Sequence, residues 1–222
     1  MKQFFSLLFL FILVFGFSYA QEDITTNPNQ PSKSFGQLPL NESDALSVTI
    51  THSVDPITVT AGMSVSCNNG GITADNQYWR SFILADFGIT DDFTVTMVEV
   101  GIENATAGSG GQQPMTVNLY TADSPWPTVS LTLIGTADVM VPDQALTLFQ
   151  IPVTGTAPAG SELVVEISIP DATGGENHTF FLGANNLGQT ADSWLSSTSC
   201  AIPGPPAGLP VTTQSIGFPD AM

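Results

Sequence analysis

Positively charged residues are almost absent from this sequence. Its 222 residues include 3 Lys+Arg against 20 Asp+Glu, which gives a formal net charge of -17, although only 10% of the chain is charged. Nucleic-acid binding requires a cationic surface that neutralises phosphates, and anionic membranes attract clusters of basic residues. Lys2, Lys33 and Arg80 cannot form such a surface. We therefore expect no nucleic-acid partner and no binding to an anionic membrane.

Long apolar runs are also missing, except near the N-terminus. Lys2 precedes an apolar run of 14 residues, Phe4–Phe17, and small residues flank Tyr19 just before Gln21. This pattern is typical of a secretory signal over residues 1–20, since the run is short for a membrane span. The alternative is an uncleaved membrane anchor. Cleavage predicts a secreted, extracellular or cell-surface protein with no membrane insertion afterwards.

Cysteine is scarce, and Cys67 and Cys200 are the only two. In an oxidising compartment an even pair most simply forms one disulfide. Two free or metal-bound cysteines are the alternative. The chain lacks a CxxC spacing and has only His52 and His178, so a zinc site would need four isolated residues to converge.

Beyond the signal, composition divides the chain into two parts. Residues 21–45 are rich in Asn, Pro, Gln, Ser and Thr and are expected to form a flexible polar arm. Residues 46–222 have enough apolar residues for a core and form the predicted domain.

Within this domain, apolar and polar residues alternate with a period of two. The clearest case is residues 162–169, where Leu163, Val165, Ile167 and Ile169 alternate with Glu162, Glu166 and Ser168. Such segments predict strands with one buried and one solvated face. The other candidates are residues 46–50, 57–65, 78–84, 93–102, 115–119, 131–141, 146–153, 179–183 and 194–198.

No segment has a capped helical pattern, and Gly, Pro and Asn clusters separate the strands. We predict an all-β domain, a two-sheet antiparallel β-sandwich of the jelly-roll type with about nine or ten strands. One strand breaks the alternation, because its apolar face switches between Met97 and Val98. Either a β-bulge lies there or the strand is buried on both sides, and both interpretations place it centrally.

Several short motifs follow one another along the chain in a characteristic order. They are Asn76–Phe82, Val98–Glu103, Val117–Tyr120, Pro158–Gly160, Gly183–Thr190, Cys200 and Ile216–Pro219. Together they resemble an uncharacterised β-sandwich module of secreted multidomain bacterial proteins, of the kind found in Bacteroidota beside peptidase, adhesion or type 9 sorting domains.

The resemblance covers roughly residues 65–222 and implies no catalytic residues. Members typically continue beyond the Gly-Phe-Pro segment into one more strand, and a type 9 secretion substrate carries a C-terminal sorting domain. This chain ends at Met222 without either. The resemblance therefore implies a C-terminally truncated sandwich that lacks its last strand.

Two kinds of ligand site are compatible with the residues. Calcium prefers oxygen ligands from loops, and the candidates are Asp75, Asp86, Asp91 and Asp92. Carbohydrates bind on exposed aromatic rings, and Trp126 lies between two prolines in a segment too short to bury it easily. Tyr120 and Trp194 are possible neighbours of this platform, whereas Trp79 falls in an apolar strand and is expected in the core.

Arg80 is the one basic residue of the predicted strands, and Glu99 or Glu103 is its expected bidentate carboxylate partner. Catalysis is poorly supported, since no G-x-S-x-G elbow exists. We expect His52 to pack at the core edge, and His178 and the acids Glu162 and Glu166 to be solvated.

The leading hypothesis is a non-catalytic extracellular module with an accessory or adhesive role in a larger protein. Its partner is an extracellular glycan or protein. The alternatives are a calcium-assisted carbohydrate-binding module and a hydrolase fragment.

The signal makes a direct prediction. Removing 20 of the 222 residues leaves 202, and the exported protein should begin at Gln21. Intact mass spectrometry of the protein recovered outside the cell checks this. A mass that includes Met1–Ala20 would indicate the uncleaved anchor.

Overall fold

The structure, a computed structural model, describes residues 47–109 and 111–219. The predicted signal and polar arm lie outside these residues. The described residues from Val48 onward belong to one compact unit, Val48–Met222. The expected missing strand concerns sequence beyond Met222 and stays a prediction.

The unit is built from antiparallel strands, which confirms the predicted all-β sandwich. The strands are β1 (Asn68–Asn69), β2 (Ile72–Thr73), β3 (Asn76–Ile83), β4 (Phe93–Thr106), β5 (Gln113–Ala122), β6 (Leu131–Val141), β7 (Gln144–Ala157), β8 (Glu162–Ile169), β9 (Thr179–Leu182), β10 (Trp194–Ser196) and β11 (Val211–Thr212). The 3-10 helices η1 (Leu84–Phe87) and η2 (Thr213–Ile216) follow β3 and β11. No helix in these described ranges is long and apolar enough to cross a membrane.

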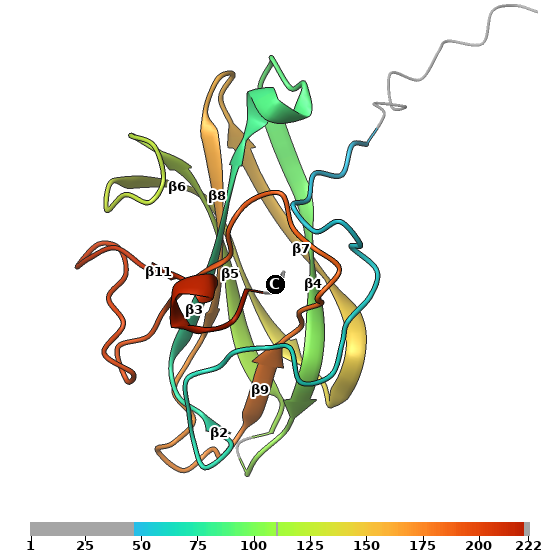
Figure 1. The fold of residues 1–222 in the computed structure, drawn as a ribbon, viewed down its shortest axis with the longest axis vertical. Coiled ribbons are helices and arrows are strands. Elements are labelled where there is room, and N and C mark those ends of the chain that lie inside the picture. The colour runs from blue at the N-terminus through green and yellow to red at the C-terminus, as the bar shows by residue number, and fades with distance from the viewer. Residues whose placement is uncertain (1–46, 110, 220–222) are drawn as a thin grey trace, which may run out of the picture. The chain divides into compact units, whose positions relative to one another are not determined.

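Two main sheets form the sandwich. The larger has the order β11-β10-β3-β8-β5-β6, and the smaller has the order β7-β4-β9; β1 and β2 form a separate pair. Figure 1 shows the long strands of both sheets running lengthwise through the molecule. Predicted strands at residues 46–50 and 57–65 are wrong, because the described part of this stretch contains no strand.

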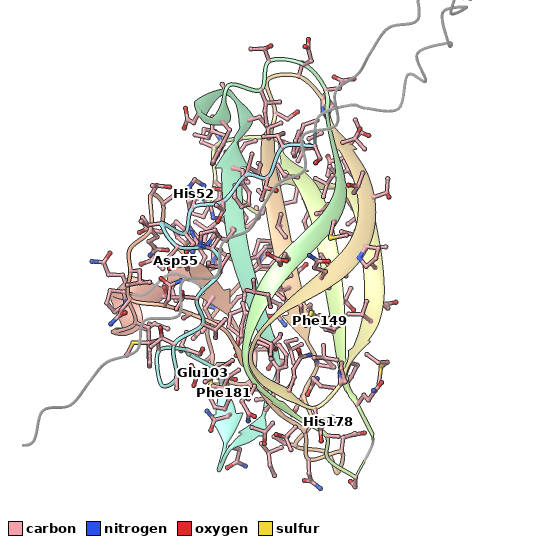
Figure 2. All side chains as sticks on the ribbon, turned by 90° about the vertical axis from the view of Figure 1, so that its right-hand side faces the viewer. His52, Asp55, Glu103, Phe149, His178 and Phe181 are labelled. Carbon is pink, nitrogen blue, oxygen red and sulfur yellow. A yellow bond between two sulfur atoms is a disulfide. The ribbon has the colours of Figure 1, made fainter. Side chains whose placement is uncertain are left out.

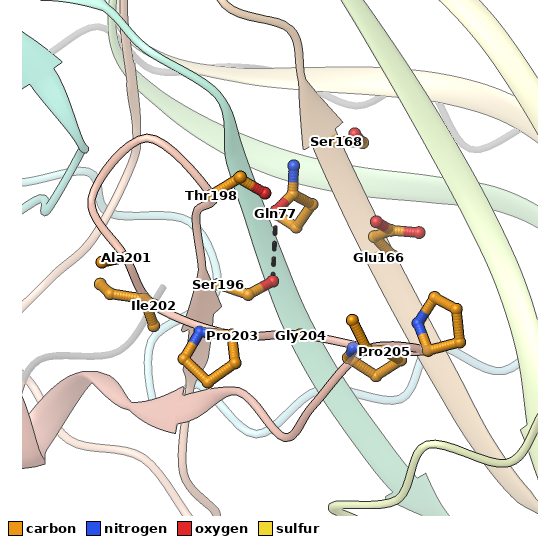
Figure 3. A pocket seen from close by; sticks show the side chains of 12 residues that line it. Gln77, Glu166, Ser168, Ser196, Thr198, Ala201, Ile202, Pro203, Gly204 and Pro205 are labelled. Atoms are coloured by element: carbon orange, nitrogen blue, oxygen red, sulfur yellow. Dashed lines mark hydrogen bonds between the residues drawn. The ribbon is translucent and has the colours of Figure 1, made fainter.

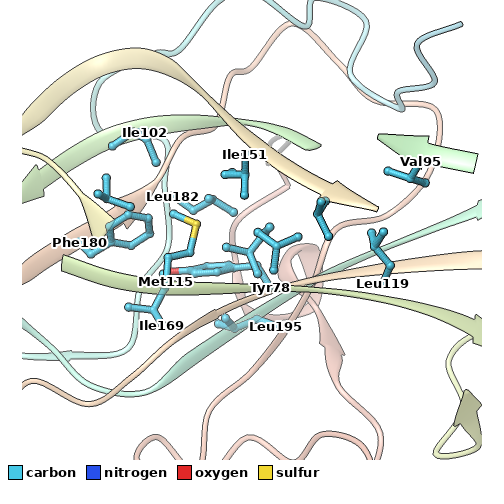
Figure 4. Packing of buried hydrophobic residues seen from close by; sticks show 14 of the residues in the cluster. Tyr78, Val95, Ile102, Met115, Leu119, Ile151, Ile169, Phe180, Leu182 and Leu195 are labelled. Atoms are coloured by element: carbon cyan, nitrogen blue, oxygen red, sulfur yellow. The ribbon is translucent and has the colours of Figure 1, made fainter. Parts of the chain in front are cut away.

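The core lies between the inner faces of the two sheets (Figure 4). Met115, Leu119 and Ile169 contribute to it from the large sheet, and Ile102 and Ile151 from the small one. All five side chains are almost fully buried. Burying each such side chain contributes about 1.5–3 kcal/mol, so the period-two apolar residues supply much of the fold's stability.

The irregular strand is β4, which lies between β7 and β9 as the central strand of the small sheet. Its register with β7 shifts between Val95 and Met97. Val95 is 7% exposed and Ile102 is fully buried, whereas Met97 is 48% exposed. The bulge interpretation is therefore confirmed close to the predicted position, and it returns the later apolar residues of β4 to the core.

The predicted disulfide between Cys67 and Cys200 is present. It joins the chain before β1 to the turn after β10, across 133 residues. Asp75 supports the same turn, because its carboxylate accepts hydrogen bonds from the N–H groups of Thr198 and Ser199, each at 2.7 Å. Burial raises the pKa of Asp75, but these hydrogen bonds outweigh it and the pKa is lowered overall.

The expected pairing of Arg80 with Glu99 or Glu103 is wrong. Arg80 lies on β3, whose neighbours are β10 and β8, whereas both glutamates lie on β4 in the other sheet. The guanidinium instead donates to the side-chain oxygen of Gln189 at 3.0 Å and to the carbonyl of Ala191 at 3.2 Å. Arg80 thus attaches the segment before β10 to β3.

The two glutamates have local partners. Glu103, labelled in Figure 2, accepts hydrogen bonds from the N–H groups of Gly62, Met63 and Ser64. Glu99 accepts one from the amide of Gln150 on the neighbouring strand β7. Strand pairing therefore decided the roles of these charges.

Replacing Arg80 by Met should destabilise the fold. Burial lowers the pKa of Arg80 to about 10, with Asp192 opposing the change, so the side chain is charged at neutral pH. Loss of hydrogen bonds from a charged donor costs about 2–3 kcal/mol, and urea unfolding at pH 7 would measure it. An unchanged transition would show that this attachment contributes no stability.

Candidate functional site

The outer face of the large sheet carries a row of chemically unusual side chains. In the strand register Trp194 of β10 lies opposite Trp79 of β3, Trp79 opposite Glu166 of β8, and Glu166 opposite Asn118 of β5. Neighbouring residues such as Tyr78 face the core instead, because successive side chains of a strand point to opposite faces. Side chains from four strands therefore lie in one row, on the face of the sheet that points away from the core.

Four aromatic rings gather on this face, and we call Trp79, Tyr120, Trp126 and Trp194 the aromatic cluster. The ring centroids of Trp79 and Trp126 are 5.5 Å apart, and those of Trp126 and Trp194 are 6.1 Å apart in an edge-to-face arrangement. Tyr120 lies 6.1 Å from Trp79. The chain has only three Trp, so all of them belong to this cluster.

The structure thus brings together Trp126, Tyr120 and Trp194, the three predicted ligand-binding residues. Trp126 is less exposed than expected, because it is half-buried against Trp79. Its backbone N–H donates to Glu162 at 3.0 Å, which attaches the β5–β6 connection to β8. The indole N–H of Trp126 is buried and has no partner in the described part of the chain.

Trp79 is buried as expected, at 3% exposed. It lies against Tyr120 and Trp126 on the outer face, however, and not in the cluster between the two sheets. Its indole N–H donates to the hydroxyl of Ser196 at 2.9 Å. The signal for this placement was present in the sequence, because Trp79 shares its parity with the polar residues Gln77 and Ser81.

Glu166 is buried beneath this face, which corrects the expectation that it is solvated. It is 7% exposed, and its Oε2 accepts hydrogen bonds from the Asn118 amide and the Tyr120 hydroxyl, both at 2.9 Å. Burial raises the pKa of Glu166, although these two hydrogen bonds act in the opposite direction. A buried carboxyl group with a raised pKa is more typical of a binding or catalytic site than of a solvated surface.

An open groove of about 640 Å³ borders Glu166 (Figure 3). Strands β3, β8 and β10 contribute polar side chains, and the segment after β10 contributes eight residues, three of which are prolines. The lining residues are Gln77, Glu166, Ser168, Ser196, Thr198, Ala201, Ile202, Pro203, Gly204, Pro205, Pro206 and Ala207. We call this the outer-face groove.

Short contacts connect the groove to the aromatic cluster. The Ser196 hydroxyl accepts from Trp79 and donates to Gln77 Oε1 at 3.2 Å. Gly204 lies so close to Ser196 that an added Cβ would collide with it. The loop can therefore approach the sheet only because residue 204 has no side chain.

The groove has no positive charge. None of its lining residues is Lys, Arg or His. Arg80 is the one Lys or Arg in the described ranges, and it binds Gln189 and Ala191. Anionic ligands are therefore disfavoured, whereas the aromatic rings, hydroxyls, amide and carboxyl group suit a polyhydroxylated ligand with apolar faces.

The four predicted calcium ligands do not gather in one cluster. Between residues 47 and 219, leaving aside residue 110, no three His, Cys, Asp or Glu side chains come close enough to hold a metal ion. Asp75 accepts the turn hydrogen bonds described above, and Asp92 accepts the N–H of Ala159 at 2.9 Å. Asp86 and Asp91 are exposed.

His52 packs at the core edge as predicted. Its Nε2–H donates to the carbonyl of Ser81 at 2.9 Å, and its Nδ1 lies 2.8 Å from the Thr190 hydroxyl. The ring stacks on Phe82 at 4.9 Å and meets the edge of Phe87. Burial is the main reason that the pKa of His52 is lowered.

The expectation that His178 is solvated is wrong. This residue is 3% exposed, and its Nδ1 accepts the N–H of Gly108 at 3.0 Å. Figure 2 shows His52 and His178 far apart along the molecule. Each imidazole is thus held by structural hydrogen bonds away from the outer-face groove.

Comparison of the chain with protein-family models, curated proteins and solved structures finds no match in any of the three.

Replacing Glu166 by Gln tests its burial. Because the folded-state pKa is raised above 4.5, the neutral form stabilises the fold at low pH, and this contribution is lost as pH rises through the folded pKa. The variant should therefore gain stability relative to the parent between pH 4 and pH 8. Urea unfolding of both proteins measures the difference. A difference that does not change with pH would contradict a buried, destabilised carboxylate.

Proposed function

We propose that the protein is a non-catalytic extracellular β-sandwich module that binds a glycan on the outer face of its large sheet. Its role is accessory or adhesive, within a larger secreted or cell-surface protein. The observation that carries the proposal is the aromatic cluster beside a groove lined by Glu166, Gln77, Ser168 and Ser196. Aromatic faces stack on the C–H surfaces of sugars, and the polar groups bind their hydroxyls.

The extracellular location is supported by the Cys67–Cys200 disulfide, since disulfides persist in oxidising compartments. The expected signal over residues 1–20 agrees with it. The acidic composition and the resemblance to a secreted bacterial module support the same assignment.

A binding role accounts for the acids of β8 better than hydrolysis does. Glu162 and Glu166 are four residues apart on one strand, so their backbones are roughly 13 Å apart. Paired catalytic carboxyls of glycosidases lie about 5–9.5 Å apart. Glu162 also holds the Trp126 backbone, which gives it a structural role. Calcium is not part of the proposal, because the predicted ligands do not converge.

A glycan array with and without EDTA tests the function. Binding that survives EDTA is expected, and affinities for the bound glycans then follow from titration of tryptophan fluorescence. All three Trp lie in the aromatic cluster, so this signal reports on the site alone. Absence of binding under both conditions would overturn the proposal.

Replacing Trp126 by Ala should weaken glycan binding at least about 10-fold, because truncating a Trp at a binding hot spot costs about 2 kcal/mol or more. The matched control is Val129→Ser in the same connection, where Val129 is 47% exposed. Calorimetry should find parental affinity for this control. Equal losses in both variants would indicate that the connection, rather than the indole, is responsible.

A further inference from the structure

The two oxygens of Glu166 have different environments. Oε2 accepts both hydrogen bonds, from Asn118 and Tyr120. Oε1 has no hydrogen-bond partner within residues 47–109 and 111–219. It differs from the fully enclosed side-chain atoms that lack a partner, because it is not enclosed by the protein. Because Glu166 lines the outer-face groove, this oxygen is accessible to a ligand there.

Within the described part of the chain, the Glu166 carboxylate has no compensating cation. Burying a carboxylate is costly unless a positive charge or several donors accompany it. Two neutral donors contact Glu166, and the groove contains no Lys, Arg or His. A ligand that brings its own positive charge would supply the missing partner, and its hydrogen bond would be charge-assisted.

The aromatic cluster adds to this preference. Tyr120 is partly exposed and donates its hydroxyl to Glu166, and Trp126, also partly exposed, packs on the buried Trp79. Indole faces attract cations as well as sugar C–H groups. A ligand with a sugar ring and an attached ammonium group therefore satisfies both the cluster and Glu166.

We infer that the outer-face groove prefers a glycan containing free amino sugars, such as a de-N-acetylated hexosamine oligomer, whose ammonium group binds Glu166. This inference rests on the proposed glycan-binding function and names the class of glycan. The negative charge of Glu166, in a groove without Lys, Arg or His, excludes acidic glycans. Neutral glycans of the same backbone bind through the aromatic cluster, but more weakly.

The test uses β-1,4-linked oligosaccharides of equal length that differ at carbon 2 of each sugar. One series carries a free amine, one an N-acetylated amine and one a hydroxyl. Calorimetry at pH 6 with the folded protein should find the free-amine series bound about 10-fold or more tightly than the other two, as expected for a hydrogen bond between charged groups. Glu166→Gln should abolish this preference, so that the free-amine series binds the variant no more tightly than the hydroxyl series does.

General attraction of a cationic oligosaccharide to an acidic protein needs its own control. Glu99→Gln removes one negative charge from an exposed position on β4, in the other sheet. It should leave the free-amine preference intact, including in 0.5 M salt. A preference that disappears in salt, or that both variants reduce equally, would overturn the inference.

The remaining outcomes separate the inference from the proposed function. Equal binding of the three series overturns the amino-sugar preference and leaves glycan binding standing. Failure of every series, together with an empty glycan array, overturns both. Stronger binding of the N-acetylated series would assign Glu166 to a neutral hydrogen bond and would also overturn the inference.

Discussion

The arrangement depends above all on β8, which is buried on both faces. In the large sheet it lies between β3 and β5. Its inner face supplies Leu163, Ile167 and Ile169 to the core, while Val164 and Glu166 are buried on its outer face. Because side chains alternate along a strand, the register that fills the core also places Glu166 beside Trp79 and Asn118. A one-residue shift in the register of β8 would expose its core residues and would also move Glu166 out of the groove.

The walls of the groove depend on long-range attachments of the C-terminal segment. The disulfide and the Asp75 carboxylate hold the turn after β10, and Arg80 holds the segment before it. The strand between them has only three residues, and two- or three-residue strands have few ladder hydrogen bonds. The attachments therefore supply order that strand pairing alone does not, and they set the position of the proline-rich loop over the sheet.

Two groups on this face lower the stability of the fold. Among the described residues Glu166 is a buried acid without a cationic partner, and the buried indole N–H of Trp126 has no hydrogen-bond partner. Each costs free energy that an apolar side chain of similar size would not. In the same described ranges, buried polar atoms without a partner also occur on Ser64, Gln113, Gln144 and Thr213, whereas Tyr78 is buried in the core and donates its hydroxyl to the Val65 carbonyl at 3.0 Å. Glu166 differs from these residues because it is a carboxyl group that borders a groove.

By itself the sequence determined the local features. Period-two patterns predicted β6 and β8, the switch in parity predicted the bulge in β4, and the cysteine count predicted the disulfide. The near absence of Lys and Arg also agrees with a groove whose lining residues include no positive charge. Strand pairing decided the rest, because alternation says which face a residue is on but not which strand lies beside it. The partner of Arg80, the burial of Glu166 and His178, and the outward position of Trp79 all follow from neighbours distant in the chain. Residues 57–65 alternate like a strand but form none, and the backbone N–H of Thr60 donates to the Ala184 carbonyl outside any ladder. Only the tertiary structure could decide this, because a local pattern does not determine whether a neighbouring segment completes a hydrogen-bonded ladder.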